Sequence, residues 1–319
     1  MIIVSLFYLG KNVLSNKSYD ASDIEVLEGL EPVRKRPGMY IGGTDRNGMH
    51  HLFAEVIDNS MDEAVAGFAT FIEVNIDLNN KITVFDNGRG IPIDKHPKYP
   101  KKSALEVILT TLHAGGKFNN KIYQTSGGLH GVGISVVNAL SESLEVEVYR
   151  DKSIYLQNYK KGIPNGNIEK LDQKTNKKGT KITFKPDEEI FDKNVKFNIE
   201  KLYNFCKSKA YLFAGIEIRW SCNELVAEEN NIPRSEIFNF SKGLEVFLVN
   251  EVKGSTFIAQ ESFSGKKEKD SKNNSIEWAV NWSMSSDGFL NSYCNTVPTP
   301  DGGTHELGLK NGLLKALRS

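Results

Sequence analysis

The stretch Asp86-Asn87-Gly88-Arg89-Gly90-Ile91-Pro92 is the part of the sequence that indicates the fold most directly. It follows the apolar run Lys81–Phe85, which predicts a strand, and its two glycines let the backbone come close to a ligand. Asp86 is the one carboxylate in this turn, and it could accept a hydrogen bond from the exocyclic amino group of adenine. A plain turn at the end of a strand is the alternative, so the interpretation as a nucleotide site depends on the other motifs of the sequence.

A helix predicted over Met49–Gly67 precedes this turn and carries polar side chains four residues apart. Glu55, Asn59 and Glu63 share one face, because residues i and i+4 are neighbours on a helix. The Asn59 amide oxygen could complete a Mg²⁺ shell, since magnesium prefers oxygen ligands and keeps several waters. The Glu55 carboxylate could take a proton from an attacking water molecule as a general base. A solvated polar face is the alternative, and the helix taken alone favours it.

The third stretch is Ser126-Gly127-Gly128-Leu129-His130-Gly131-Val132-Gly133, which opens a helix predicted over Val132–Leu140. Glycines at a helix N-terminus expose backbone N–H groups, and the helix dipole favours an anion there, so this stretch predicts a phosphate cradle. It is neither a P-loop, because GxxxxGK[ST] is absent from the chain, nor a GxGxxG dinucleotide motif. Upstream, Gly115-Gly116-Lys117 places a cation on a loop, and Lys178-Gly179-Thr180 enters a strand that could approach the base.

The remaining pattern alternates strands and helices, which predicts an α/β fold. Further strands are expected at Phe71–Leu78, Leu144–Tyr149, Ser153–Tyr159, Thr180–Phe184 and Ile216–Trp220, and further helices at Leu105–His113 and Phe197–Tyr211. Ala114–Gly128 is expected to form a loop and Asn223–Arg234 a linker, followed by a second α/β segment from Ile237 and a helix that begins near Gly308.

The composition is that of an ordinary globular protein, with 39% hydrophobic and 25% charged residues among 319. Basic and acidic residues balance at 40 each, so bulk charge gives no sign of a nucleic-acid surface. The three scattered cysteines form no CxxC pair and are typical of a reducing cytoplasm. The start of the sequence does not predict a signal peptide, and no apolar run approaches ~20 residues, so we expect a cytoplasmic protein without a membrane partner.

These stretches, in this order, resemble the GHKL superfamily of ATPases, which share the Bergerat nucleotide fold. Val33-Arg34-Lys35-Arg36-Pro37-Gly38-Met39-Tyr40-Ile41-Gly42 is similar to the signature of the B subunits of bacterial type II DNA topoisomerases. The segments His51–Asn59, Asn120–Ser126 and Tyr211–Trp220 look more like the topoisomerase IV branch than the gyrase branch. The resemblance covers the chain from about Tyr19 to its end.

The resemblance implies roles for individual residues. Glu55 matches the general base, supported by His51, and Asn59 matches the magnesium ligand of the bound ATP. Asp86 matches the carboxylate that reads adenine, and Arg89 orders the acidic helix through Glu63. The other positions that match the ATP site are Tyr19, Gly90, Ile91, Pro92, Lys117, Tyr123, Gly128, Leu129, His130, Gly131, Val132, Gly133, Ile134 and Thr180. Of these, Lys117 and Tyr123 fall in a lid over ATP, and Tyr19 falls in an arm that enters the partner subunit's site. Separately, Arg150 matches an arginine at a pocket rim where coumarin inhibitors bind.

The resemblance also implies an organisation. We expect an N-terminal extension (1–18) without an assigned role, an ATPase domain with its arm (19–236), in which helices are layered on a mixed sheet, and a truncated α/β transducer domain (237–319). ATP and Mg²⁺ would close a homodimeric gate that drives DNA strand passage and serves chromosome segregation. Its partners would be double-stranded DNA and the topoisomerase A subunit (ParC-like), in a complex of two A and two B subunits.

Three alternatives stay open. The chain could be a fragment that binds ATP without efficient hydrolysis, because the transducer lysine that touches the γ-phosphate in the family would lie beyond Ser319. A sensor kinase would need a phospho-accepting histidine on an upstream helix, which the sequence does not predict. A repair or chaperone ATPase is disfavoured by the signature at 34–42.

Overall fold

The computed structural model describes residues 20–116, 131–252, 256–267, 275–284 and 288–318. Its main sheet is built from β1 (Phe71–Ile76), β2 (Ile82–Asp86), β5 (Ser141–Arg150), β6 (Ser153–Lys160), β7 (Ile163–Pro164), β8 (Glu169–Lys174), β9 (Gly179–Pro186), β10 (Glu217–Cys222) and β11 (Ser235–Phe238). The strand order is β11-β10-β1-β2-β9-β5-β6-β7, and β8 pairs with β6. Only the β1–β10 pair is parallel among these strands, so the sheet is mixed, as expected.

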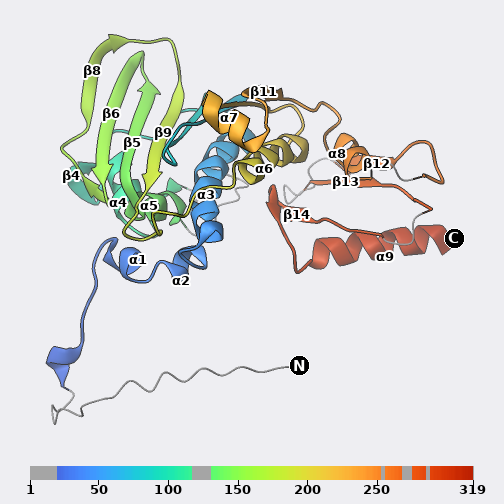
Figure 1. The fold of residues 1–319 in the computed structure, drawn as a ribbon, viewed down its shortest axis with the longest axis horizontal. Coiled ribbons are helices and arrows are strands. Elements are labelled where there is room, and N and C mark those ends of the chain that lie inside the picture. The colour runs from blue at the N-terminus through green and yellow to red at the C-terminus, as the bar shows by residue number, and fades with distance from the viewer. Residues whose placement is uncertain (1–19, 117–130, 253–255, 268–274, 285–287, 319) are drawn as a thin grey trace.

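Helices cover one face of this sheet (Figure 1). The helices of this part of the chain are the short 3₁₀ turn η1 (Ala21–Asp23), α1 (Glu31–Lys35), α2 (Gly38–Ile41), α3 (Arg46–Val65), α4 (Ala104–Thr110), α5 (Gly133–Ala139), α6 (Ile199–Leu212) and α7 (Glu224–Asn230). A small hairpin, β3 (Lys95–His96) and β4 (Tyr99–Ser103), leads into α4. The core lies between the two layers, where Leu52, Phe53 and Val56 of α3 pack with the alternate residues Ile72 and Val74 of β1. Alternate residues of a strand point to opposite faces of the sheet, and the apolar set faces α3.

Helix α3 is the central helix of this layer, and its ends follow from local chemistry. The Asp45 side chain accepts a hydrogen bond from the Gly48 backbone N–H at 3.0 Å, which satisfies one of the free donors of the first turn. The helix ends at Val65, and Gly67 follows with a φ of 80°. The helix predicted from Met49 therefore begins three residues earlier, at Arg46.

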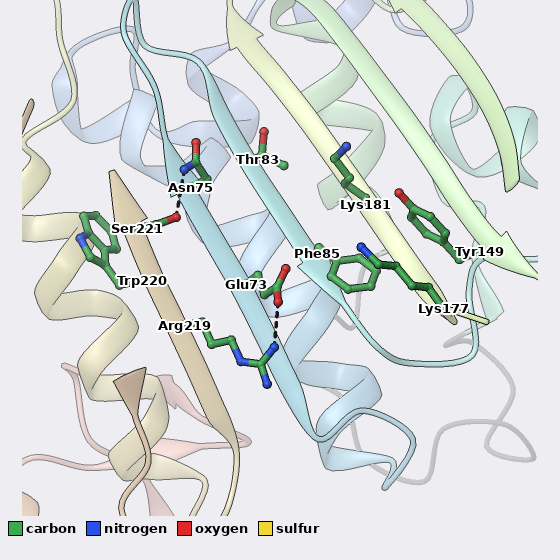
Figure 2. Close-up of a pocket in the computed structure, with 10 residues that line it drawn as sticks. All are labelled: Glu73, Asn75, Thr83, Phe85, Tyr149, Lys177, Lys181, Arg219, Trp220 and Ser221. Atoms are coloured by element: carbon green, nitrogen blue, oxygen red, sulfur yellow. Dashed lines mark hydrogen bonds and ion pairs between the residues drawn. The ribbon is translucent and has the colours of Figure 1, made fainter. Parts of the chain in front are cut away.

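The opposite face of the sheet carries cross-strand polar pairs around a shallow hollow of about 450 Å³ (Figure 2). Arg219 of β10 pairs with Glu73 of β1 at 2.8 Å, and Asn75 donates to Ser221 at 2.9 Å. The helices lie behind the strands in this view, so these side chains project away from them. Polar cross-strand pairs of this kind are typical of a sheet face that is open to solvent.

The second part of the chain contains α8 (Gly243–Glu251), β12 (Phe263–Lys267), β13 (Ile276–Val280), β14 (Tyr293–Cys294), β15 (Val297–Pro298) and α9 (Thr304–Arg318). β12 pairs with β13 and β14 with β15, each pair antiparallel. An aromatic contact joins this part to α6, because Tyr211 stacks on Phe240 with ring centroids 3.8 Å apart and on Phe247 at 5.3 Å. Figure 1 shows β14 passing near α6, with α9 beyond it.

One expected segment is wrong. The predicted linker Asn223–Arg234 contains helix α7, which begins because the Asn223 side chain accepts from the Leu225 N–H at 3.1 Å and which buries Val226 and Ala227. Strand β11 also spans the expected domain border after residue 236, so the main sheet extends two residues beyond it. The division of the chain at that border stays a prediction. The last helix begins at Thr304, four residues before Gly308.

Candidate functional site

Asp86 ends strand β2 with a side chain that is almost completely buried. The Ser60 hydroxyl donates to its Oδ2 at 3.1 Å, and the Gly88 N–H donates to its Oδ1 at 2.9 Å. Burial, together with the nearby charge of Glu63, raises the pKa of Asp86 from 3.8 to about 7. A carboxylate held in this way keeps lone pairs for a further donor, such as the amino group of a base.

Arg89 and Glu63 form the second contact of the site. The Arg89 Nη2 lies 2.7 Å from Glu63 Oε1, and its Nε donates to Oε2 at 3.1 Å. The Arg89 backbone N–H also donates to Oε2 at 3.0 Å, and the guanidinium lies 3.8 Å from the centroid of the Phe68 ring. This two-pronged pairing ties the turn after β2 to the end of α3, between the two residues that the resemblance places together.

Glu55 lies against the first turn of α5. A Cβ atom placed on Gly133 would come within 1.9 Å of Glu55 Oε2, so only glycine fits there while the carboxylate holds this position. Helices α3 and α5 pack together, which brings Glu55 to the end of α5 where backbone N–H groups lack helical partners. Asn59 follows one turn later on α3 and is half-buried. The expected carboxylate and amide therefore lie on a helix that contacts the described end of the glycine-rich stretch.

These residues fit a magnesium ion that takes most of its ligands from elsewhere. Within the ranges the structure describes, no three His, Cys, Asp or Glu side chains gather closely enough to hold a metal by themselves. Magnesium usually binds through one or two protein groups plus phosphate oxygens and waters. The Asn59 amide oxygen, on the helix whose Glu55 lies against Gly133, matches that ligand pattern.

Thr180 lies directly opposite Asp86 in the β2–β9 register. Its Oγ1 accepts a hydrogen bond from the Ile91 N–H at 3.1 Å, which joins β9 to the turn after β2. Gly179 has a φ of 121°, and a Cβ there would lie 1.7 Å from the Asp86 carbonyl oxygen. The backbones therefore approach so closely that no larger residue fits beside Asp86.

The other predicted positions are distributed around this centre. Arg150 Nη1 donates to the Gly90 carbonyl oxygen at 3.4 Å, so the expected rim residue contacts the turn that follows β2. Val132 and Ile134 are half-buried at the start of α5, and Pro92 is exposed. Tyr19, Lys117, Tyr123, Gly128, Leu129 and His130 lie outside the described residues, and their roles stay predictions.

The two adjacent histidines of α3 differ in environment. His51, the expected support for Glu55, is exposed. His50 is half-buried, its Nε2 accepts from the Asn198 N–H at 3.0 Å, and its ring stacks on Phe197. Burial lowers the pKa of His50 to about 4, helped by the charges of Lys201 and Arg46. His50 therefore acts as a neutral acceptor between α3 and α6.

Two contacts in or beside the site were not found from the sequence. Ser60 follows Asn59 and holds Asp86, which its hydroxyl and its sheet-facing position on α3 could have indicated. Lys209 of α6 is buried and pairs with Asp58 of α3 at 2.6 Å, a contact that no local pattern predicts.

Two protein-family models match the chain. The histidine kinase-, DNA gyrase B-, and HSP90-like ATPase family matches residues 44–190, and the DNA gyrase B family matches residues 243–319. The first match includes Glu55, Asp86, Gly133 and Thr180, and the second begins where α8 begins. No helix in the described ranges has the length and apolar character needed to cross a membrane.

Curated relatives and a solved structure are similar over most of the chain. The B subunit of DNA topoisomerase 4 is 53% identical in Bartonella bacilliformis (95% of this chain, 44% of the relative) and 56% in Caulobacter vibrioides (94% and 44%). The B subunit of DNA gyrase from Synechocystis is 42% identical over 96% of this chain and 28% of the relative. The crystal structure of the 43K ATPase domain of Thermus thermophilus gyrase B with an aminocoumarin matches with a TM-score of 0.76 and 35% identity, covering 91% of this chain and 72% of that one. The chain thus spans less than half the length of these curated relatives.

Proposed function

The chain belongs to the GHKL-type ATPase region of bacterial type II DNA topoisomerase B subunits, and on that premise we propose that it binds and hydrolyses ATP with Mg²⁺ to drive DNA strand passage. The observation that carries the proposal is the buried carboxylate of Asp86, opposite Thr180 and tied through Ser60 to the helix that bears Glu55. The identity to the topoisomerase 4 relatives is higher than the identity to the gyrase relative, which favours the topoisomerase IV branch.

In this proposal, each residue has a defined task. Asp86 accepts the adenine amino group, and Asn59 provides the protein oxygen to Mg²⁺, which supplies charge neutralisation on the phosphates when bound. Glu55 takes the proton of the attacking water, and His51 supports it. The segment 128–134 holds phosphate oxygens through its backbone N–H groups. Arg89 holds α3 in position through its contact with Glu63. Lys117 and Tyr123 close over the bound ATP, and Arg150 lies at the rim of the nucleotide pocket.

The larger assembly is also part of the proposal. Two copies of the chain would dimerise when ATP binds, with Tyr19 entering the partner subunit's site. The complex would include the topoisomerase A subunit (ParC-like) and double-stranded DNA, would act in chromosome segregation, and would reside in the cytoplasm.

Two measurements test the proposal. Isothermal calorimetry with a non-hydrolysable ATP analogue, with and without Mg²⁺, should give binding that strengthens with the metal. Phosphate release by the native chain at saturating ATP should then exceed that of its Glu55→Ala variant. Absence of analogue binding would contradict the proposal. Binding without phosphate release by the native chain would support the alternative that it binds ATP without efficient hydrolysis.

A further inference from the structure

Lys209 on α6 is a buried lysine, with only 2% of its side chain exposed. Lysines are almost never buried unless their charge is paired, because removing an ammonium group from water is costly. The Lys209 Nζ lies 2.6 Å from Asp58 Oδ1 and 5.0 Å from the centroid of the Phe205 ring. The charge is therefore fixed between α6 and α3 rather than left in solvent.

The same ammonium group reaches the second part of the chain. Lys209 Nζ donates to the Thr296 carbonyl oxygen at 2.8 Å, in the turn that joins β14 to β15. Both residues of this turn have positive φ, 49° at Asn295 and 68° at Thr296. A β-branched residue rarely adopts that backbone conformation, so the turn needs support from its surroundings. A charge-assisted hydrogen bond to its carbonyl group is such a support.

The other partner of Lys209 lies on α3, the helix that also carries Glu55 and Asn59. Asp58 directly precedes Asn59 and follows Glu55 by three residues on α3, which is one continuous helix from Arg46 to Val65. A shift of α3 at Asn59 therefore moves the Asp58 carboxylate, and Lys209 must either follow it or give up one of its two contacts. The side chain thus joins the helix of the nucleotide site to the β14–β15 turn through two short polar contacts.

We propose that Lys209 is a positioning residue that couples nucleotide binding at α3 to the conformation of the β14–β15 turn. This inference rests on the proposed function, because it takes the nucleotide to bind beside Asn59 and Glu55. Lys209 itself lies on another helix and contacts neither predicted ligand group in the described structure. Its part is to transmit a change in α3 to the turn.

The chain contains its own reporter for this coupling. Of its three cysteines, Cys206 and Cys222 are buried and Cys294 is exposed. Cys294 ends β14, two residues before Thr296. The rate at which a thiol reagent modifies Cys294 in the 319-residue chain, with and without a non-hydrolysable ATP analogue and Mg²⁺, therefore reports on the turn.

We expect the analogue to change this rate severalfold in the native chain, and we expect the change to disappear in Lys209→Met while the Kd for the analogue stays within about threefold. Lys209→Arg should restore part of the response because it keeps the cation. Lys207→Met, two residues away on α6, is the matched control and should respond like the native chain. A purely structural Lys209 would alter the unfolding temperature and leave the response to the analogue intact.

Asp58→Asn keeps the size of the side chain and provides a second variant if Lys209→Met does not fold. It should weaken the response without abolishing analogue binding. A full response in either folded variant would overturn the coupling, as would a native chain that binds the analogue with no change at Cys294. Failure of the native chain to bind the analogue would instead remove the proposed function, and calorimetry separates the two cases.

Discussion

Replacing Asp86 by asparagine should separate nucleotide binding from folding. The carboxylate is buried and accepts from the Ser60 hydroxyl and the Gly88 N–H. In Asp86→Asn the amide oxygen can still accept from Gly88, and the amide NH₂ can donate to the Ser60 oxygen after the hydroxyl rotates. The bond to adenine loses its charge, which is worth about 1.5–3 kcal/mol. We therefore expect the Kd for ATP to weaken roughly 10- to 150-fold at pH 8.

The stability of the same variant should change in the opposite direction. Because burial raises the pKa of Asp86 to about 7, folding is penalised increasingly as the pH rises from about 4 to about 7, and the penalty is complete above that range. A rise in pKa from 3.8 to about 7 corresponds to up to about 4 kcal/mol. Asparagine carries no such penalty, so Asp86→Asn should unfold at a temperature equal to or higher than that of the native chain at pH 8.

Calorimetry and thermal unfolding at pH 6 and pH 8 check both expectations. Below its pKa, Asp86 is protonated, so the native chain should bind ATP up to about tenfold more weakly at pH 6 than at pH 8. The variant should lack that dependence. Asp172→Asn, an exposed aspartate on β8, is the matched control and should behave like the native chain in both assays. An Asp86→Asn variant that binds ATP with native affinity would refute the adenine role, and one that binds weakly because it is unfolded would refute the folding argument.

Three further predictions concern other residues of the candidate site. Glu55→Ala should keep ATP binding and lower phosphate release by ~10²–10⁴ relative to the native chain, and unchanged turnover in the variant would place the base elsewhere. Gly133→Ala should displace the Glu55 carboxylate and slow phosphate release by roughly 10²-fold, with Gly312→Ala, on the open surface of α9, as the control that leaves it unchanged. Arg89→Ala should lower the free energy of unfolding by about 1–3 kcal/mol because it strands buried Glu63, and chemical denaturation should show a smaller loss for Arg89→Lys.

The candidate site was predictable where its chemistry is local in the sequence. The 86–92 turn, the four-residue spacing of Glu55, Asn59 and Glu63, and the strand at 180–184 all depend on short-range periodicity and turn residues. The Arg89–Glu63 contact was predicted only because the resemblance to the family supplied it. The prediction of a linker at α7 was wrong for a local reason as well. Most residues at 223–231 are polar, and only two side chains of the helix, Val226 and Ala227, are buried, so the apolar pattern is weak.

The sequence by itself determined that a carboxylate follows a strand, that a polar helix precedes it and that glycines open a later helix, since neighbouring residues alone fix these patterns. Only the tertiary structure decided which groups meet. Thr180 faces Asp86 because of the β2–β9 register, and His50 rather than His51 faces α6 because of the rotation of α3. Lys209 joins Asp58 to Thr296 across 151 and 87 residues of chain. The physical reason is that such contacts depend on how the layers pack around a common core, and that packing is set by the whole chain at once.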